Sequence, residues 1–328
     1  MLVAINENHE YVLAKQAIKN RNYYCPHCRT KVILKNGAKV IAHFAHMYPC
    51  KLWRSKGESA LHYQTKYKIA EMFKRVNYNV EIEPYYENIQ QFPDIVVNSS
   101  FAIEVQFSSI PLSEIQKRTV GLMSVGLRPV WIIEDIKYRN GKLTLNNQQA
   151  SFINAIHRSL YTWQEKCCQL IRYSNIQNIG GRQFRATRTI VEDVATILTE
   201  KRHNNMAYYK LDESLITRYI QYCRRKNSVL EPTLSAMYQL RLNDKHVIQQ
   251  FGIIIPLQIF IKTHPIEWQL QFRLLELRDE LTCQNIDTVI KLRHFANHHY
   301  SQSILLNKII EQYQNARKTK CNDVQIIR

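Results

Sequence analysis

Residues 92–107 read FPDIVVNSSFAIEVQF, two short apolar runs separated by a polar Asn-Ser-Ser turn. Turn residues between two such runs predict a hairpin of two strands. Successive side chains of a strand point to opposite faces. Ile103 and Val105 therefore share one face of the second strand. Glu104 and Gln106 share the other face, so one side of this hairpin is apolar and the other polar.

Two carboxylates belong to this hairpin. Asp94 stands where the first strand begins, and Glu104 lies within the second strand. Carboxylate oxygens at one edge of a sheet suit a hard cation such as Mg²⁺. A metal ion bound there can activate a water molecule and stabilise charge on a phosphate. The alternative is a half-buried hairpin whose polar face meets solvent, because Asp and Glu are common on exposed strand faces.

The spacing of these residues resembles the PD-(D/E)xK nuclease core, in which Pro-Asp is followed about ten residues later by a second acidic motif. The resemblance implies that Asp94 and Glu104 bind a catalytic Mg²⁺ or Mn²⁺. Gln106 stands where the pattern has Lys, which would orient and help to deprotonate the attacking water. Glutamine is neutral and can hold a water without supplying charge. Three basic residues are candidates to compensate: Lys66, Lys117 and Arg118.

A second candidate metal site lies near the N-terminus. Cys25 and Cys28 form a Cys-x-x-Cys knuckle, a spacing that holds one side of a tetrahedral Zn²⁺. A hairpin over residues 32–42, with its turn at Asn36-Gly37, returns the chain towards this knuckle. A segment this short buries little apolar surface, so we expect the metal to supply folding free energy. The alternative, a redox Cys-x-x-Cys, lacks the βαβ pattern that usually surrounds it.

The ligands that complete this zinc site are open. His43, His46 and Cys50 all follow the hairpin, and two of the three are needed. We favour His46 as one ligand and keep His43 and Cys50 as alternatives for the other. His43 and His46 cannot point the same way on a regular strand. We therefore expect the backbone to bend between them.

Residues 58–75 predict an amphipathic helix. Glu58 and His62 fall within its core-facing stripe, and Lys66 flanks the stripe. Ionisable groups on an inner face need partners or a cleft. A helix packed on the sheet could therefore deliver Glu58 and His62 to the metal edge. The alternative is that Glu58 only complements the helix dipole.

The elements around the hairpin follow an α/β order. A strand at 80–83 precedes it, a helix at 108–121 follows it, and the apolar run at 129–133 predicts a buried strand. Beyond about residue 150 we expect mainly helices, among them 190–202, 212–226, 267–281 and 303–318. Arg182, Arg185 and Arg188 recur every third residue there and are candidates to track phosphates, although a solvated helix face fits equally well.

Four further motifs stand in a fixed order: CPHC at 25–28, HFAH at 43–46, ESALH at 58–62 and VWII at 130–133. Together with the hairpin they resemble the competence protein CoiA family over roughly residues 1–135. We therefore expect an α/β protein with a zinc ribbon-like segment at 1–57, a PD-(D/E)xK-like three-layer nuclease core at 58–165 and a mainly α-helical region at 166–328.

The charge distribution fits a polyanionic partner. The formal net charge is +18. Residues 1–57 carry a net charge of +8 and residues 166–328 carry +10, whereas residues 58–165 are neutral. Two basic flanks around a neutral middle are expected if the flanks contact the phosphate backbone. A merely basic protein is the alternative.

The expected cellular compartment is inferred from the lack of recognisable targeting signals in the sequence. The N-terminus, MLVAINE, has neither a basic region nor a long apolar run, which argues against a signal peptide. The apolar run at 251–261 is interrupted by Pro256 and is too short to span a bilayer. We expect a cytoplasmic protein whose eight cysteines bind metal or stay as free thiols.

The leading hypothesis is a zinc-bearing, Mg²⁺- or Mn²⁺-dependent DNA nuclease that acts on single-stranded DNA. The resemblance places it in natural transformation, near the strand-exchange recombinase and other recombination proteins. The rival is a catalytically weak or inactive DNA-binding recombination mediator that keeps the nuclease fold. A third possibility, a metal-dependent hydrolase of small phosphates, fits the net charge poorly.

Overall fold

The computed structural model describes residues 1–26, 28–37, 40–48, 59–200, 207–297, 300–318 and 325–327. The chain divides into two compact units. The first comprises residues 1–135, 160–172 and 189–200. The second comprises residues 136–159, 173–188 and 201–328. Glu58 and Cys50, both named as site candidates, lie outside the described residues.

The first unit begins with an antiparallel sheet in the order β2-β1-β3-β4-β5. The hairpin predicted after the knuckle is confirmed as β4 and β5, with a register shift between Lys35 and Gly37. The turn expected at Asn36-Gly37 is wrong, because both residues belong to β4 and Gly37 pairs with Val40. Apolar side chains such as Tyr23, Val32 and Phe44 form a small core of its own. The strands are β1 (Val3–Ile5), β2 (Tyr11–Leu13), β3 (Tyr23–Tyr24), β4 (Lys31–Gly37) and β5 (Val40–His46).

The second sheet of this unit is mixed. Strands β6, β7 and β8 pair antiparallel, and β8–β9 and β9–β12 pair parallel. The predicted hairpin is confirmed as β7 and β8, joined by a turn in which Asn98 and Ser99 have positive φ. The strands are β6 (Val80–Ile82), β7 (Ile95–Val97), β8 (Phe101–Gln106), β9 (Arg128–Glu134) and β12 (Leu160–Gln164).

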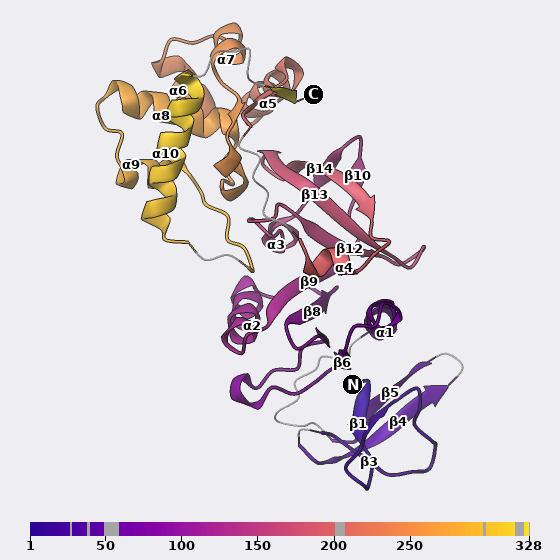
Figure 1. The fold of residues 1–328 in the computed structure, drawn as a ribbon. Helices are drawn as coiled ribbons and strands as arrows, with labels where there is room; N and C mark the ends of the chain where they lie inside the picture. Colours follow the sequence, from indigo (N-terminus) through magenta and orange to yellow (C-terminus); the bar gives the residue numbers. More distant parts are fainter. Residues whose placement is uncertain are drawn as a thin grey trace. The chain divides into compact units, whose positions relative to one another are not determined.

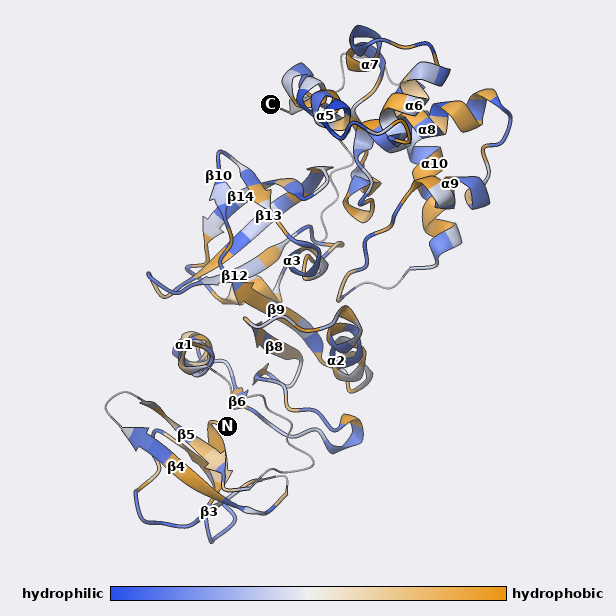
Figure 2. Ribbon diagram, turned by 180° about the vertical axis from the view of Figure 1, so that it is seen from behind, coloured by the Kyte–Doolittle hydropathy of each residue, from blue (hydrophilic) through white to orange (hydrophobic). Residues whose placement is uncertain are grey.

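Helices α1 (Ala60–Arg75) and α2 (Leu112–Ser124) lie on opposite sides of this sheet (Figure 1). The odd-numbered positions of β8, such as Ile103, pack with α1. The even-numbered Ala102 packs with Leu122 of α2. The expected three-layer α/β core is therefore confirmed, and Figure 2 shows that the run at the centre of the sheet, β9, is mostly hydrophobic. Two short helices, η1 (Glu87–Ile89) and α4 (Ala195–Leu198), complete the unit.

The second unit contains a smaller β region and a helical region. Strand β13 (Gln169–Gly180) begins in the first unit and continues into the second, where it pairs with β14 (Gln183–Ile190). Buried residues of α5, α6, α7 and α8 share one core. The remaining elements are β10 (Tyr138–Arg139), β11 (Lys142–Thr144), α3 (Asn147–Ser151), β15 (Tyr209–Leu211), α5 (Glu213–Arg225), α6 (Pro232–Gln239), α7 (Asp244–Gln250), β16 (Ile253–Ile254), η2 (Pro256–Phe260), α8 (Pro265–Leu277), α9 (Cys283–Val289), α10 (Gln302–Lys318) and β17 (Gln325–Ile327).

The expectation of helices directly after residue 150 is wrong. Residues 160–190 form β12, β13 and β14, and the predicted helix at 190–202 shrinks to the single turn of α4. Buried Phe184 and Ala186 alternate with exposed Gln183 and Arg185, which is a strand period of two. Arginines three residues apart on such a strand do not share a face. The predicted helices at 212–226, 267–281 and 303–318 are confirmed as α5, α8 and α10.

No helix in the described ranges is both long enough and apolar enough to cross a lipid bilayer.

Candidate functional site

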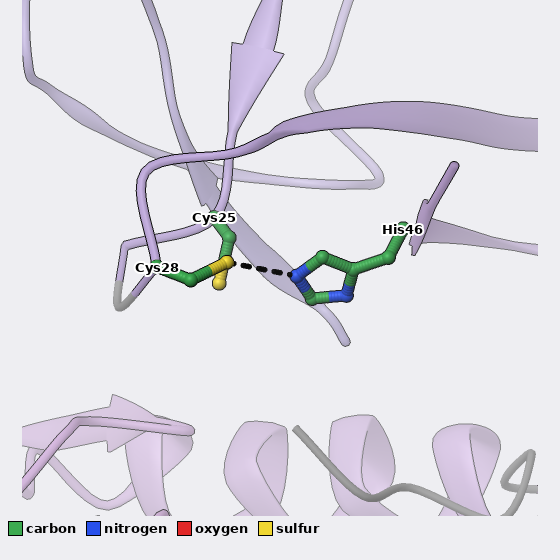
Figure 3. A group of neighbouring side chains, drawn as sticks. All are labelled: Cys25, Cys28 and His46. Atoms are coloured by element: carbon green, nitrogen blue, oxygen red, sulfur yellow. Dashed lines mark hydrogen bonds between the residues drawn. The ribbon is translucent and has the colours of Figure 1, made fainter. Parts of the chain in front are cut away.

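Three side chains of the N-terminal sheet converge on one point (Figure 3). The Sγ atoms of Cys25 and Cys28 and a ring nitrogen of His46 all lie within 4.8 Å of one another. Cys28 Sγ and His46 Nε2 are 3.3 Å apart. Elsewhere in the described ranges, no other three His, Cys, Asp or Glu side chains meet so closely. Two sulfurs and an imidazole at this spacing could hold a metal ion, and they are donors that a tetrahedral Zn²⁺ takes.

The backbone explains why these side chains meet. Cys25 follows β3, and its N–H donates to Thr30 O at 2.9 Å while Arg29 N–H donates to Cys25 O at 3.0 Å. This tight turn, with Arg29 at a φ of 58°, brings Cys28 back beside Cys25. His46 ends β5, which pairs with β4 beside β3. Burial lowers the pKa of His46, which favours the neutral imidazole that binds metals.

His43, one of the alternatives, points away from the knuckle. Its Nδ1 lies 2.7 Å from Ile41 O, and its ring stacks on Tyr63 of α1 with centroids 5.2 Å apart. The expected bend between His43 and His46 is wrong, because β5 runs through both and its alternation alone separates them. Cys50 lies outside the described residues, so its role as the fourth ligand remains a prediction from the sequence.

A second cluster surrounds Asp94 at the edge of the mixed sheet. Two helices and three strands contribute to it: α1, α2, the end of β6, the start of β7, and β8. Most of its side chains are buried although they are charged. We call this cluster the carboxylate site, and its members are His62, Lys66, Glu83, Asp94, Glu104, Gln106 and Arg118.

Asp94 is the centre of the carboxylate site. Its Oδ2 accepts a hydrogen bond from Val105 N–H at 2.8 Å and lies 3.5 Å from His62 Nε2. Its Oδ1 lies 2.7 Å from Lys66 Nζ. Burial opposes ionisation, but the charge of Lys66, together with the nearby His62 and Arg118, holds the pKa of Asp94 well below its usual range. Asp94 is therefore an anion in the folded protein.

Helix α1 positions the two basic partners of Asp94. Ser59 is the N-cap, and its Oγ accepts a hydrogen bond from His62 N–H at 3.2 Å, which fixes the first turn. Lys66 follows one turn later on the same face. Its side chain is 1% exposed, so the residue predicted to flank the stripe is in fact in the interior. Glu58, expected to act beside His62, lies outside the described residues.

Glu83 belongs to the carboxylate site although sequence reasoning did not select it. Its Oε1 lies 3.0 Å from Lys66 Nζ, opposite Asp94. The alternation of residues 80–83 predicts Glu81 and Glu83 on the same face. The strand ends at Ile82, however, and Glu83 has a φ of 52°. This left-handed residue turns its side chain inward while Glu81 stays exposed. No propensity signal in the sequence marks such a turn.

Glu104 is 1% exposed, so the polar face of the hairpin does not meet solvent. Its Oε2 pairs with the Arg118 guanidinium from α2. Its Oε1 has no hydrogen-bond partner among the described residues. Burial raises the pKa of Glu104 to about 8, with the Asp94 charge adding to this and Arg118 opposing it. A buried carboxylate oxygen without a partner fits a position where a cation binds.

The side-chain amide nitrogen of Gln106 donates two hydrogen bonds. Nε2 donates to Ser108 O at 2.8 Å and to Ser108 Oγ at 2.9 Å. The amide oxygen is the group left to accept a hydrogen bond from a water molecule. Of the three residues considered as replacements for the missing Lys, Lys66 contacts Asp94 and Arg118 contacts Glu104, whereas Lys117 is exposed.

Comparison with known proteins adds to this geometry. A family model described as "Competence protein CoiA, N-terminal domain" matches residues 6–51, and one described as "Competence protein CoiA, nuclease-like domain" matches residues 58–206. Competence protein CoiA of Bacillus subtilis (strain 168) is 32% identical over 123 residues, 36% of this chain and 33% of that protein. The match thus spans about a third of that relative's length. No solved structure matches the chain.

Proposed function

The chain belongs to the competence protein CoiA family, and from this premise we propose that it processes DNA during natural transformation, with a metal-dependent nuclease centre at the carboxylate site. The observation that carries the proposal is the pair Asp94 and Glu104. They are buried, close enough for the charge of one to raise the pKa of the other, and Glu104 Oε1 has no partner among the described residues. Buried charged groups contribute little net stability, and carboxylate oxygens are ligands of hard cations, so the pair supports a cation-binding role.

The residues have distinct roles in this proposal. Asp94 and Glu104 would hold Mg²⁺ or Mn²⁺, which supplies Lewis-acid polarisation of a phosphate oxygen and a more acidic water. The Lys66 ammonium, held beside Asp94, contributes positive charge for a phosphoryl group whose negative charge grows in the transition state. The Gln106 amide oxygen orients a water. His62, 3.5 Å from Asp94, is placed to exchange a proton with solvent or with the leaving group.

The experiment that tests this function is a Mg²⁺ and Mn²⁺ titration of the purified protein with labelled linear, single-stranded and branched DNA. Metal-dependent cleavage of at least one form that EDTA abolishes is the expected result. The absence of cleavage of every form, with DNA binding retained, would contradict the nuclease function.

That outcome would favour a second candidate, a non-catalytic DNA-binding mediator with a nuclease fold. One observation supports it: both carboxylates already face cationic side chains, Asp94 with Lys66 and Glu104 with Arg118. Such pairs can replace a metal ion as the source of positive charge. The mediator predicts that DNA binding and transformation persist when the metal-binding carboxylates are neutralised.

We propose that Cys25, Cys28 and His46, with Cys50 as the candidate fourth ligand, bind a structural Zn²⁺, and that the protein acts in the cytoplasm. The donor set favours Zn²⁺ over Mg²⁺, because thiolates are soft ligands. A metal-content measurement on protein purified without chelators tests this identity.

Gln106→Lys is expected to keep or raise the rate of cleavage. The new ammonium would lie next to Ser108 O and near Glu104, and it restores the residue that the nuclease pattern has at this position. Single-turnover cleavage of labelled DNA at saturating Mg²⁺ measures the effect. Gln106→Met, of similar size but without a polar end, is the matched variant and should slow cleavage. A faster Met variant than Lys variant would contradict a water-orienting role for Gln106.

DNA affinity is expected to fall steeply with salt, and part of this dependence should come from α5. Arg218, Tyr222 and Arg225 lie on one exposed face of this helix, and neither arginine forms an ion pair with a described residue. An arginine that neutralises a phosphate of a single strand contributes about 0.7 to the slope of log affinity against log salt. Replacing Arg218 and Arg225 by Gln should reduce the slope by up to about 1.4.

The matched control for this prediction is Arg224 on the same helix. It is already paired with Asp244 through two contacts of 2.8 and 2.5 Å. Arg224→Gln should therefore change the slope less than either of the other substitutions. Equal effects of all three, measured by fluorescence anisotropy in EDTA, would show that net charge rather than this face determines affinity.

A further inference from the structure

We propose that Glu83 is a positioning residue that holds the Lys66 ammonium against Asp94, and that it connects this ammonium to the backbone of the N-terminal sheet. The effect that we expect Glu83 to have on catalysis rests on the proposed nuclease function. It concerns the arrangement of side chains within the first unit, so it can be tested without catalysis.

The first step is the environment of Lys66. A buried ammonium needs compensating charge and hydrogen-bond acceptors. Lys66 has both, with Asp94 Oδ1 at 2.7 Å and Glu83 Oε1 at 3.0 Å. A flexible lysine side chain held from one side only could rotate. Held between two carboxylates, its Nζ stays at one place beside Asp94.

The second step is what holds Glu83. Its main-chain N–H donates to Asp94 O at 3.0 Å, so its backbone is tied to the residue that Lys66 must face. Its Oε2 accepts a hydrogen bond from Leu2 N–H at 2.6 Å. Both carboxylate oxygens are therefore engaged, one by α1 and one by the N-terminal segment. Burial opposes the ionisation of Glu83, but the charge of Lys66 lowers its pKa.

The third step is the contact of the N-terminal sheet with the nuclease-like core. Leu2, which is fully buried, packs in the same core cluster as Tyr67 and Phe73 of α1. His43 of β5 stacks on Tyr63, which precedes Lys66 by three residues. The sheet therefore contacts the helix that carries Lys66 as well as the carboxylate that positions it. The N-terminal segment thus reaches the carboxylate site through Leu2 N–H, which donates to Glu83 Oε2.

A merely structural ion pair is the alternative. A buried Glu–Lys pair can contribute to stability without affecting the place of the ammonium in the site. The two roles differ in what happens to Lys66 when the charge of Glu83 is removed, and in whether the effect of that change requires Lys66.

The first measurement is acylation of Lys66 by an amine-reactive reagent, followed by mass spectrometry of the full-length protein. Lys66 is 1% exposed and paired twice, so it should react slowly in the wild type. Glu83→Gln keeps the acceptor for Leu2 N–H and nearly the same size but loses the charge. It should raise the rate at Lys66 by about tenfold or more while exposed lysines react as before. Glu81→Gln, an exposed neighbour on β6, should leave the rate unchanged.

The second measurement is a double-mutant cycle with Lys66→Met, read as cleavage rate and as Mn²⁺ affinity. If Glu83 acts through Lys66, then Glu83→Gln changes both quantities in the wild type and adds nothing in the Lys66→Met background. Glu83→Asp, which keeps the charge on a shorter side chain, should restrain Lys66 better than Glu83→Gln and guards against a variant that fails to fold.

The outcomes separate the two claims. An unchanged acylation rate at Lys66 in folded Glu83→Gln would overturn the positioning role, as would fully multiplicative effects in the cycle. A wild type that neither cleaves DNA nor binds Mn²⁺ would overturn the proposed function instead, while the acylation result would still decide the role of Glu83.

Discussion

Asp94→Asn should abolish metal-dependent cleavage while the protein stays folded. Asparagine nearly preserves the shape of aspartate but removes one negative charge from the site proposed to hold a dication. The loss expected for a group that organises transition-state charge is about 10²- to 10³-fold. The measurement is single-turnover cleavage of labelled single-stranded DNA at a range of Mg²⁺ concentrations. Higher metal concentrations should recover part of the rate if weakened metal binding is the cause.

The structure indicates why folding should survive this change. Lys66 loses one of its two carboxylates but keeps Glu83 at 3.0 Å, so its charge is still compensated. The Val105 N–H that donates to Asp94 Oδ2 can still donate to the amide oxygen of Asn. A cost of about 1–3 kcal/mol in unfolding free energy is expected, because one buried polar contact becomes imperfect.

Two controls sharpen this test. DNA binding in EDTA should be unchanged, because the basic residues proposed to contact phosphates, such as Arg218 and Arg225 of α5, lie outside the carboxylate site. Glu134→Gln, at an exposed position of β9, should cleave like the wild type. If Asp94→Asn supports transformation in cells as well as the wild type does, the carboxylate site has no essential chemical role and the mediator function is favoured.

The sequence predicts the sheet better than it predicts the site. Ile103 and Val105 alternate with Glu104 and Gln106, so the two faces of this strand are separated correctly, and Ile103 and Val105 lie in the core that includes α1. The periodicity of α1 is also strong enough to place His62 on the inner face. It misplaces Lys66, because a long charged side chain at the border of an apolar stripe is ordinarily exposed. Only the three-dimensional positions of Asp94 and Glu83 make its burial favourable.

The failures share one cause, which is that a single dihedral angle or a distant partner can override local pattern. Glu83 enters the site because its φ is positive, which alternation cannot anticipate. The helices expected after residue 150 are replaced by β12, β13 and β14 over residues 160–190, where buried and exposed side chains alternate along β14. Gly180 ends β13, and Gly181 lies in the turn before β14. Spacing alone does not tell which face of β5 lies towards the knuckle, so the sequence keeps His43 as a zinc candidate although its ring stacks on Tyr63.

Loss of the Zn²⁺ proposed to bind near the N-terminus should strongly reduce the stability of the protein. We expect about one tightly bound Zn²⁺ per chain, and Cys25→Ser or Cys28→Ser should release it and lower the yield of soluble protein. The small N-terminal sheet has a core of few buried apolar residues, so metal binding and folding should be coupled. Metal content by elemental analysis and thermal unfolding by circular dichroism measure the two consequences.

The effect should reach beyond the metal site, because the N-terminal sheet contributes Leu2 N–H to Glu83 and His43 to the face of Tyr63. Zinc-free protein should therefore show faster acylation of Lys66 and slower cleavage, although Cys25 and Cys28 belong to a different side-chain cluster from Lys66. Cys167→Ser, which changes an exposed cysteine outside the cluster, is the matched control and should change none of these quantities. Zinc-free protein that is folded, binds DNA and protects Lys66 as the wild type does would show that the N-terminal sheet forms without metal, and that its contacts with α1 and Glu83 do not depend on the Cys25, Cys28 and His46 cluster.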